Sequence, residues 1–98
     1  MAIALVAGVF SGTGNSAAVA VHGRFNITLA GFGTATVKVE RSFDESATWH
    51  VASRDAAGSE AAYEADCSLV ADEPESGVLY RLACTAHSSG TIDYRVSQ

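Results

Sequence analysis

The side chains of this 98-residue chain that could perform hydrolysis are its serines and aspartates together with His22, His50 and His87. A Ser-His-Asp triad needs a nucleophile at a sharp turn, which in α/β-hydrolases has the pattern G-x-S-x-G. The stretch at residues 14–18, GNSAA, lacks the final glycine of that pattern. The histidines fall at or near the ends of the strands expected below, where a structural role is the common one. We predict that the chain is not an enzyme.

Two pairs of carboxylates, Asp44/Glu45 and Glu73/Glu75, raise the question of acid–base catalysis or calcium binding. General acid–base catalysis needs a cleft that shifts a carboxyl pKa, whereas both pairs lie in expected turns. Calcium needs about six oxygen ligands from a dedicated loop. The glycines at residues 12–14 are not followed by the G-K-[ST] of a phosphate loop. We therefore predict no metal and no cofactor.

The chain has two cysteines, Cys67 and Cys84, and no histidine stands near them at zinc-site spacing. One interpretation is a pair of buried thiols in a reducing compartment. The other is a cross-strand pair, because a hairpin turn centred on Glu75 and Ser76 would set Cys67 opposite Cys84. Directly opposed residues have Cβ atoms about 4.5–5.5 Å apart, which is near the range for a disulfide.

The stretch at residues 42–49, SFDESATW, has the spacing of an Asp-box, S-x-D-x-G-x-T-W, with Ser46 in place of the usual glycine. Such a box closes a hairpin, because its aspartate accepts hydrogen bonds from amides of the turn. We predict a structural clip formed by Ser42, Asp44, Thr48 and Trp49, with the Trp49 ring packed into the core behind the turn. Ser46 is unfavourable there if the position requires a positive φ.

Apolar and polar residues alternate along much of the chain, at residues 24–29, 37–40, 48–51 and 79–81. This period of two is typical of half-buried strands, and glycine- and serine-rich turns separate the segments. Seven or eight short strands at spacings of about 8–12 residues favour an antiparallel sandwich or barrel. We predict an all-β fold, a single small β-sandwich of the immunoglobulin-like or jelly-roll-like kind, spanning residues 1–98 as one domain.

Charge is absent from residues 1–23 and concentrated further along the chain. The apolar run at residues 2–10 lacks the basic region of a secretory signal and is too short to span a bilayer, which takes about 20 residues. We expect a strand that is buried or packed on a partner, in a soluble protein without an export signal, made in a cytoplasm. Its assembly surface would comprise Ile3, Leu5, Val6, Val9 and Phe10.

The net charge is −5, and residues 55–75 contain seven acidic side chains and no basic one. This balance argues against binding to nucleic acid, which needs clustered Lys and Arg, and against docking on an anionic membrane. We interpret the acidic run as a solvated face.

Two blocks of the sequence resemble a family of short structural proteins of tailed bacteriophages. The first runs from GRFNITLAG at residues 23–31 through TVKVERSFD at 36–44 to Thr48-Trp49, and the second from EPESGVLYRLACTA at 73–86 to SGTIDYRVSQ at 89–98. Together they cover most of the chain in the same order. Family members usually have glycines after the aspartate, where this chain has Glu45-Ser46.

The resemblance implies a virion component with no catalytic residues to carry over, and most specifically a head decoration, or cement, protein. Such a protein binds the major capsid protein on the exterior of the head, often as a trimer. We therefore expect a homo-oligomer, with a trimer favoured, in which the uncharged first strand makes the contact and the acidic run faces solvent.

Two other functions are compatible with the sequence. A neck or tail component of the virion would use the same kind of β-domain in few copies. A carbohydrate-binding module is suggested by the Asp-box, with Phe32, Phe43 and Tyr63 as candidate stacking aromatics.

Overall fold

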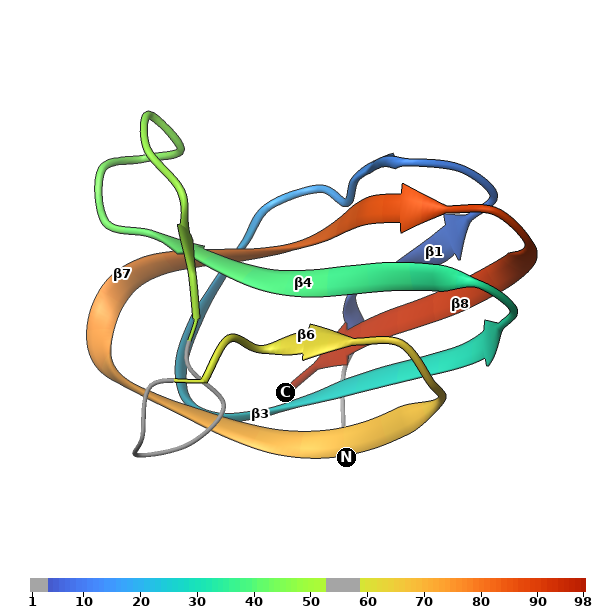
Figure 1. Cartoon of the computed structure of the whole chain (residues 1–98). Helices are drawn as coiled ribbons and strands as arrows, with labels where there is room; N and C mark the ends of the chain where they lie inside the picture. The colour runs from blue at the N-terminus through green and yellow to red at the C-terminus, as the bar shows by residue number, and fades with distance from the viewer. Residues whose placement is uncertain (1–3, 53–58) are drawn as a thin grey trace.

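The computed structural model describes residues 4–52 and 59–98, with side chains from Val6 onward, and these residues form only strands and their connections (Figure 1). The strands are β1 (Ala4–Phe10), β2 (Gly14–Asn15), β3 (Val19–Phe32), β4 (Ala35–Ser42), β5 (His50–Val51), β6 (Ala62–Tyr63), β7 (Cys67–His87) and β8 (Gly90–Ser97). All pairings are antiparallel. The predicted all-β fold is therefore confirmed.

The described strands belong to one continuous sheet, whereas a sandwich would have two. Their order is β1-β8-β3-β7-β4-β5, with β2 added to β7 and β6 added to β4. The 21-residue β7 sweeps around the left side of the view, so that its two halves lie in different layers (Figure 1). One half pairs with β3 and the other mainly with β4, so that a single bent sheet encloses the core.

The bend of β7 coincides with a large irregularity in its pairing with β3. Val21 lies opposite Val78 and Gly23 lies opposite Glu73, so residues 74–77 of β7 face a single residue of β3. Gly23 and Gly77 have φ angles of 80° and 82°, in the left-handed region that glycine adopts without a steric penalty. The extra residues lengthen the outer strand of the pair, and such bulges bend a sheet and increase its twist.

The core lies inside this bent sheet and follows the predicted alternation. Over residues 25–30 of β3 and 35–40 of β4 the inward positions are buried and the intervening ones half-buried. Fully burying an aliphatic or aromatic side chain contributes about 1.5–3 kcal/mol, so these positions dominate the stability of the fold. The largest buried apolar side chains are Phe25, Ile27, Leu29, Val37, Val78, Leu82, Ile92 and Val96.

The hairpin predicted to oppose the two cysteines does not form, and that prediction is wrong. Cys67 lies opposite Leu29 of β3, whereas Cys84 lies opposite Val37 of β4 and Gly14 of β2. The turn-forming residues around Glu75 bend β7 without reversing it. Both cysteines are free thiols, and burial raises the pKa of each.

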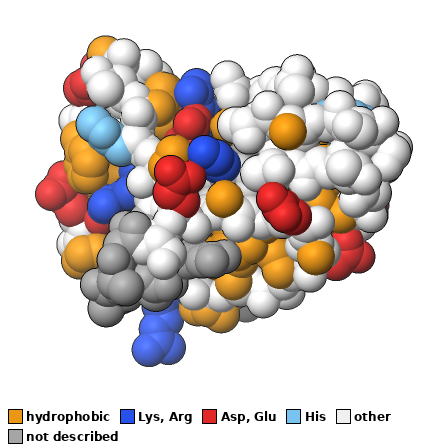
Figure 2. All heavy atoms as spheres, in the orientation of Figure 1, with side chains coloured by type: hydrophobic (Ala, Val, Ile, Leu, Met, Phe, Trp, Pro, Cys, Tyr) orange, Lys and Arg blue, Asp and Glu red, His pale blue; other side chains and the backbone are white. Residues whose placement is uncertain are grey.

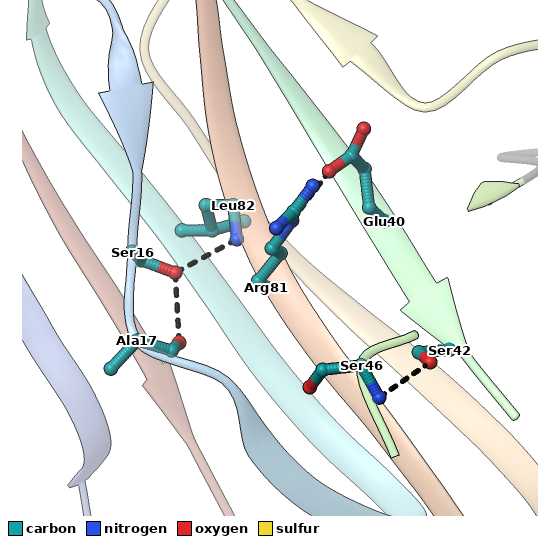
Figure 3. Close-up of polar contacts among 7 residues, drawn as sticks. All are labelled: Ser16, Ala17, Glu40, Ser42, Ser46, Arg81 and Leu82. Carbon is teal, nitrogen blue, oxygen red and sulfur yellow. Dashed lines mark hydrogen bonds and ion pairs between the residues drawn. The ribbon is translucent and has the colours of Figure 1, made fainter. Parts of the chain in front are cut away.

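Ser16 joins the connection after β2 to β7 through two hydrogen bonds to Leu82. Its backbone N–H donates to the Leu82 carbonyl at 2.8 Å, and its Oγ accepts the Leu82 N–H at 2.9 Å (Figure 3). The same hydroxyl donates to the carbonyl of Ala17 at 3.0 Å. Ser16 is buried, so its side chain takes the place of a backbone acceptor where β2 has ended.

Replacing Ser16 with alanine should leave the buried Leu82 N–H without an acceptor. We expect Ser16→Ala to lower the free energy of unfolding by about 1–2 kcal/mol in urea denaturation. Ser11→Ala, at an exposed serine between β1 and β2, is the matched control and should leave stability unchanged. An equal loss in both variants would contradict the role assigned to Ser16.

Candidate functional site: clip loop, buried carboxylate and free edge

The SFDESATW stretch forms the loop of the β4–β5 hairpin, residues 42–49, which we call the clip loop. Ser42 Oγ donates to Asp44 Oδ1 at 2.8 Å and accepts the Ser46 N–H at 3.0 Å (Figure 3). Asp44 Oδ1 also accepts the Thr48 N–H at 2.8 Å. These bonds hold the Asp44 pKa below its ordinary value, with the Thr48 amide the largest cause. Two of the four side chains predicted as a clip, Ser42 and Asp44, therefore bind amides of their own loop.

The turn requires two consecutive residues in the left-handed region. Glu45 has a φ of 57° and Ser46 has a φ of 77°. A side chain is strained there, because its Cβ crowds the backbone. Position 46 therefore has the positive φ at which serine was expected to be unfavourable.

Trp49 does not pack into the core as expected. It is half-buried, and the Arg81 guanidinium lies over its ring with Cζ 4.3 Å from the centroid. Arg81 Nε also bonds Glu40 Oε1 at 2.7 Å (Figure 3). Trp49 precedes β5, whose pairing with β4 places the ring over the outer face of the sheet. It thereby covers an arginine instead of apolar side chains.

Replacing Ser46 with glycine should stabilise the protein. A left-handed conformation costs a non-glycine residue about 1–2 kcal/mol, part of which the flexibility of unfolded glycine offsets, so we expect a gain of about 0.5–1 kcal/mol for Ser46→Gly. Chemical denaturation would measure it. Ser88→Gly is the control, because Ser88 is exposed and outside the left-handed region, and it should give no gain. A loss of stability in Ser46→Gly would contradict the strain argument.

The acidic run has one member that is not solvated. Glu73 is fully buried at the bend of β7, whereas Glu60, Glu64, Asp66, Asp72 and Glu75 are exposed and Asp55 lies outside the described residues. The interpretation of a uniformly solvated face is therefore wrong at Glu73. Side chains at 67, 69, 71 and 73 share the inward face of β7, which is why a carboxylate at this position enters the core.

The buried Glu73 carboxylate is held by three donors. Tyr80 Oη donates to Oε1 at 2.8 Å and the Glu75 N–H donates to Oε2 at 3.0 Å. Arg41 Nη2 completes the set with an ion pair to Oε1. Burial raises the pKa of Glu73, but these donors outweigh it, and the net pKa lies below the ordinary value of 4.5. Burial and the Glu73 hydrogen bond raise the pKa of Tyr80, so its hydroxyl keeps its proton.

Replacing Glu73 with glutamine should leave Arg41 without its counter-charge. Losing one partner of a buried pair costs about 3–5 kcal/mol, and we expect about 3 kcal/mol because Arg41 is partly exposed and can be hydrated. The carboxylate has a lower pKa when folded, so its stabilisation is present above pH 4.5 and is lost as pH falls through the folded-state pKa.

Denaturation of wild type and Glu73→Gln between pH 7 and pH 3 would check both points. The difference between their free energies of unfolding should shrink below pH 4.5. Glu75→Gln, at an exposed carboxylate two residues away, is the matched control. A constant difference at every pH would contradict the role of the Glu73 charge.

The predicted assembly surface lies on β1, the first strand in the order of the sheet. β8 is its one partner among the described strands. Val9 is 55% exposed, whereas Phe10 is buried and stacks on Tyr94 with centroids 4.6 Å apart. Val6 is half-buried and packs against the core. Ile3 and the Leu5 side chain lie outside the described part. Val9 is therefore the described member of the set that meets solvent.

The candidate sugar-stacking aromatics occupy three different elements. Phe43 in the clip loop is 50% exposed, and the Arg41 guanidinium lies over its ring at 4.7 Å. Phe32 and Tyr63 are partly buried and pack against the core. Phe43 is thus the one candidate of the three whose ring is largely exposed for stacking on a sugar.

Hydrophobic side chains gather between β6 and the first half of β7, in the lower part of the view (Figure 2). A cavity of about 330 Å³ lies there, and its walls include Ile27, Val39, Tyr63 and Leu69. Ile27 and Val39 belong to the core, so the cavity is a gap between the layers of the bent sheet. Within residues 4–52 and 59–98, no group of three or more His, Cys, Asp or Glu side chains could hold a metal ion. The described residues also include no helix able to cross a membrane.

Comparisons of the chain with protein-family models, with curated proteins and with solved structures found no match.

Sequence reasoning missed the contacts of Glu73 and Ser16. The inward phase of β4 runs through Val37 and Val39 to Arg41, and that of β7 runs through Ala71 to Glu73. Extending each alternation to its next inward position would have placed two opposite charges, Arg41 and Glu73, inside the sheet. The Ser16 contact had no comparable signal, because its partner is 66 residues away.

Proposed function

We propose that this chain is a structural protein of tailed-phage virions that binds the outside of the head as a homo-oligomer and stabilises the major capsid lattice. The observation that carries the proposal is the edge strand β1. It has no charged residue and no proline, and it exposes Val9. Natural proteins usually protect a free edge with such residues, so an unprotected one is suited to being covered in an assembly.

The distribution of charge supports the same function. The exposed acids at positions 60, 64, 66, 72 and 75 lie on β7 and the segment around β6, neither of which pairs with β1. A protein attached through an uncharged strand would keep these acids in water. The sequence resemblance supplies the virion as the setting, and we place the protein on the exterior of the capsid.

A neck or tail protein would use the same surface, so the number of copies separates the two locations. A carbohydrate-binding module is the candidate from another class, and the exposed Phe43 ring is the observation in its favour. Its other two candidate aromatics are partly buried, which makes this function the weaker one.

The test is the number of copies of this chain per purified particle, measured by quantitative mass spectrometry against the major capsid protein. We expect a ratio near one or a simple fraction of it, because decoration follows the capsid lattice. A handful of copies per particle would move the protein to the neck or tail. Absence from particles would overturn the virion role, and titration with glycans would then test the binding module.

A further inference from the structure

The edges of the bent sheet differ greatly in length. β1 has seven residues and a single described neighbour, whereas β5 and β6, at the other side of the sheet, have two residues each. The register shift in β1 falls between Ala4 and Val6, so the stretch Val6–Phe10 is regular. A regular edge of this length presents a row of unpaired N–H and C=O groups on the side away from β8.

Pairing of such an edge needs a second edge of matching length. Within the described residues, this chain offers two: β1 itself, and residues 67–73 of β7, which pair with β3 on one side and have no described strand on the other. A ring of three copies would have to join β1 of one copy to an unlike edge of the next, because cyclic contacts are head-to-tail. The two-residue edges β5 and β6 cannot match β1, and the edge at residues 67–73 of β7 has the exposed Asp72, a charged side chain of the kind that protects an edge from pairing. A twofold axis, by contrast, brings β1 against β1 in antiparallel orientation.

The charges favour this arrangement. Two copies with a net charge of −5 each repel one another over most of their surfaces, but residues 1–23 contain no Asp, Glu, Lys or Arg. The residues of β8 that lie opposite Val9 and Ala7 are Asp93 and Arg95, whose charges cancel. The β1 edge is therefore where two copies can approach with little electrostatic cost.

The side chains of β1 also suit close approach. Ala7 and Val9 are exposed, and a twofold axis at Ala7 would place Ala7 opposite its own copy, where two methyl groups fit. Gly8 keeps the strand on β8, because a Cβ there would lie 2.6 Å from the hydroxyl oxygen of Tyr94. Gly8 thus lets β1 pack closely against Tyr94 of β8, and the exposed side chains of β1 are small enough for a second copy to approach.

We propose that two copies of this chain pair through β1 in antiparallel orientation, so that the sheet continues across a twofold axis. The inference rests on the assembly role proposed for β1 and names its occupant as a second copy. It predicts a dimer in place of the trimer implied by the sequence resemblance. A single strand pair is a small interface, so the dimer should form reversibly and depend on concentration.

The test is sedimentation equilibrium of the full-length purified protein, which involves no virion and so can fail independently of the virion role. Wild type should be a dimer in equilibrium with monomer. Val9→Lys places a charge on the edge of each copy and should raise the dissociation constant about tenfold or more. Val70→Lys tests the head-to-tail alternative, because Val70 is 69% exposed on the β7 edge that such a ring would use, and it should leave the β1 dimer unchanged.

Hydrogen exchange gives a second readout that depends on strand pairing. Amides of residues 6–10 should become more protected as wild-type concentration rises, and Val9→Lys should abolish that dependence while remaining folded. A monomer at all concentrations up to about 1 mM would overturn the proposal. So would a trimer that Val9→Lys leaves intact, or protection of β1 that does not change with concentration.

Discussion

The buried carboxylate of Glu73 is the contact on which the rest of the architecture depends. It lies at the point where β7 leaves β3 and continues beside β4, and its donors come from the bend itself and from the β4 side of it. Tyr80 belongs to the second half of β7, Arg41 to β4, and the Glu75 amide to the bend itself. A buried carboxylate is costly without such partners. The conformation in which all three donors converge is therefore favoured over others that the bulged strand could adopt.

The bend determines which edges the sheet leaves open. Because β7 serves both layers, β3 and β4 are paired on both sides, the sheet order ends at β1 and at the short β5, and residues 67–73 of β7 are paired on the β3 side only. The clip loop ends the β4 side in a hydrogen-bonded turn, and its two-residue β5 offers little backbone for further pairing. At the opposite end β1 is long and regular. The difference between the two edges follows from the path of β7, and the proposed assembly depends on it.

The elements that could be predicted from the sequence are those governed by local pattern. Alternation at residues 24–29 and 37–40 corresponds to the inward and outward positions of β3 and β4. The left-handed turn at Ser46 follows from the spacing of the SFDESATW stretch.

What could not be predicted depends on partners distant in sequence. The EPESG stretch at residues 73–77 has the composition of a hairpin turn, and composition alone does not distinguish a reversal from a bend. The outcome is decided by Arg41 and by the pairing of residues 79–87 with β4. The position of Trp49 also depends on a distant partner, since the Arg81 against which its ring packs comes from another strand.

The hydrogen bonds inside the protein also determine which polar groups are free to act on a partner. In the clip loop, the oxygens of Ser42 and Asp44 accept amides of their own turn. The Glu73 carboxylate is surrounded by donors from the protein, and the Ser16 hydroxyl is bonded to two backbone groups. These side chains resemble catalytic or ligand-binding groups in type, yet their hydrogen-bonding capacity is used to hold strands together. Along β1 the situation is reversed, because its side chains are uncharged while the backbone on its outer side lacks a partner among the described strands. An edge of that kind is suited to pairing with another strand through its backbone, and the proposed assembly rests on this property.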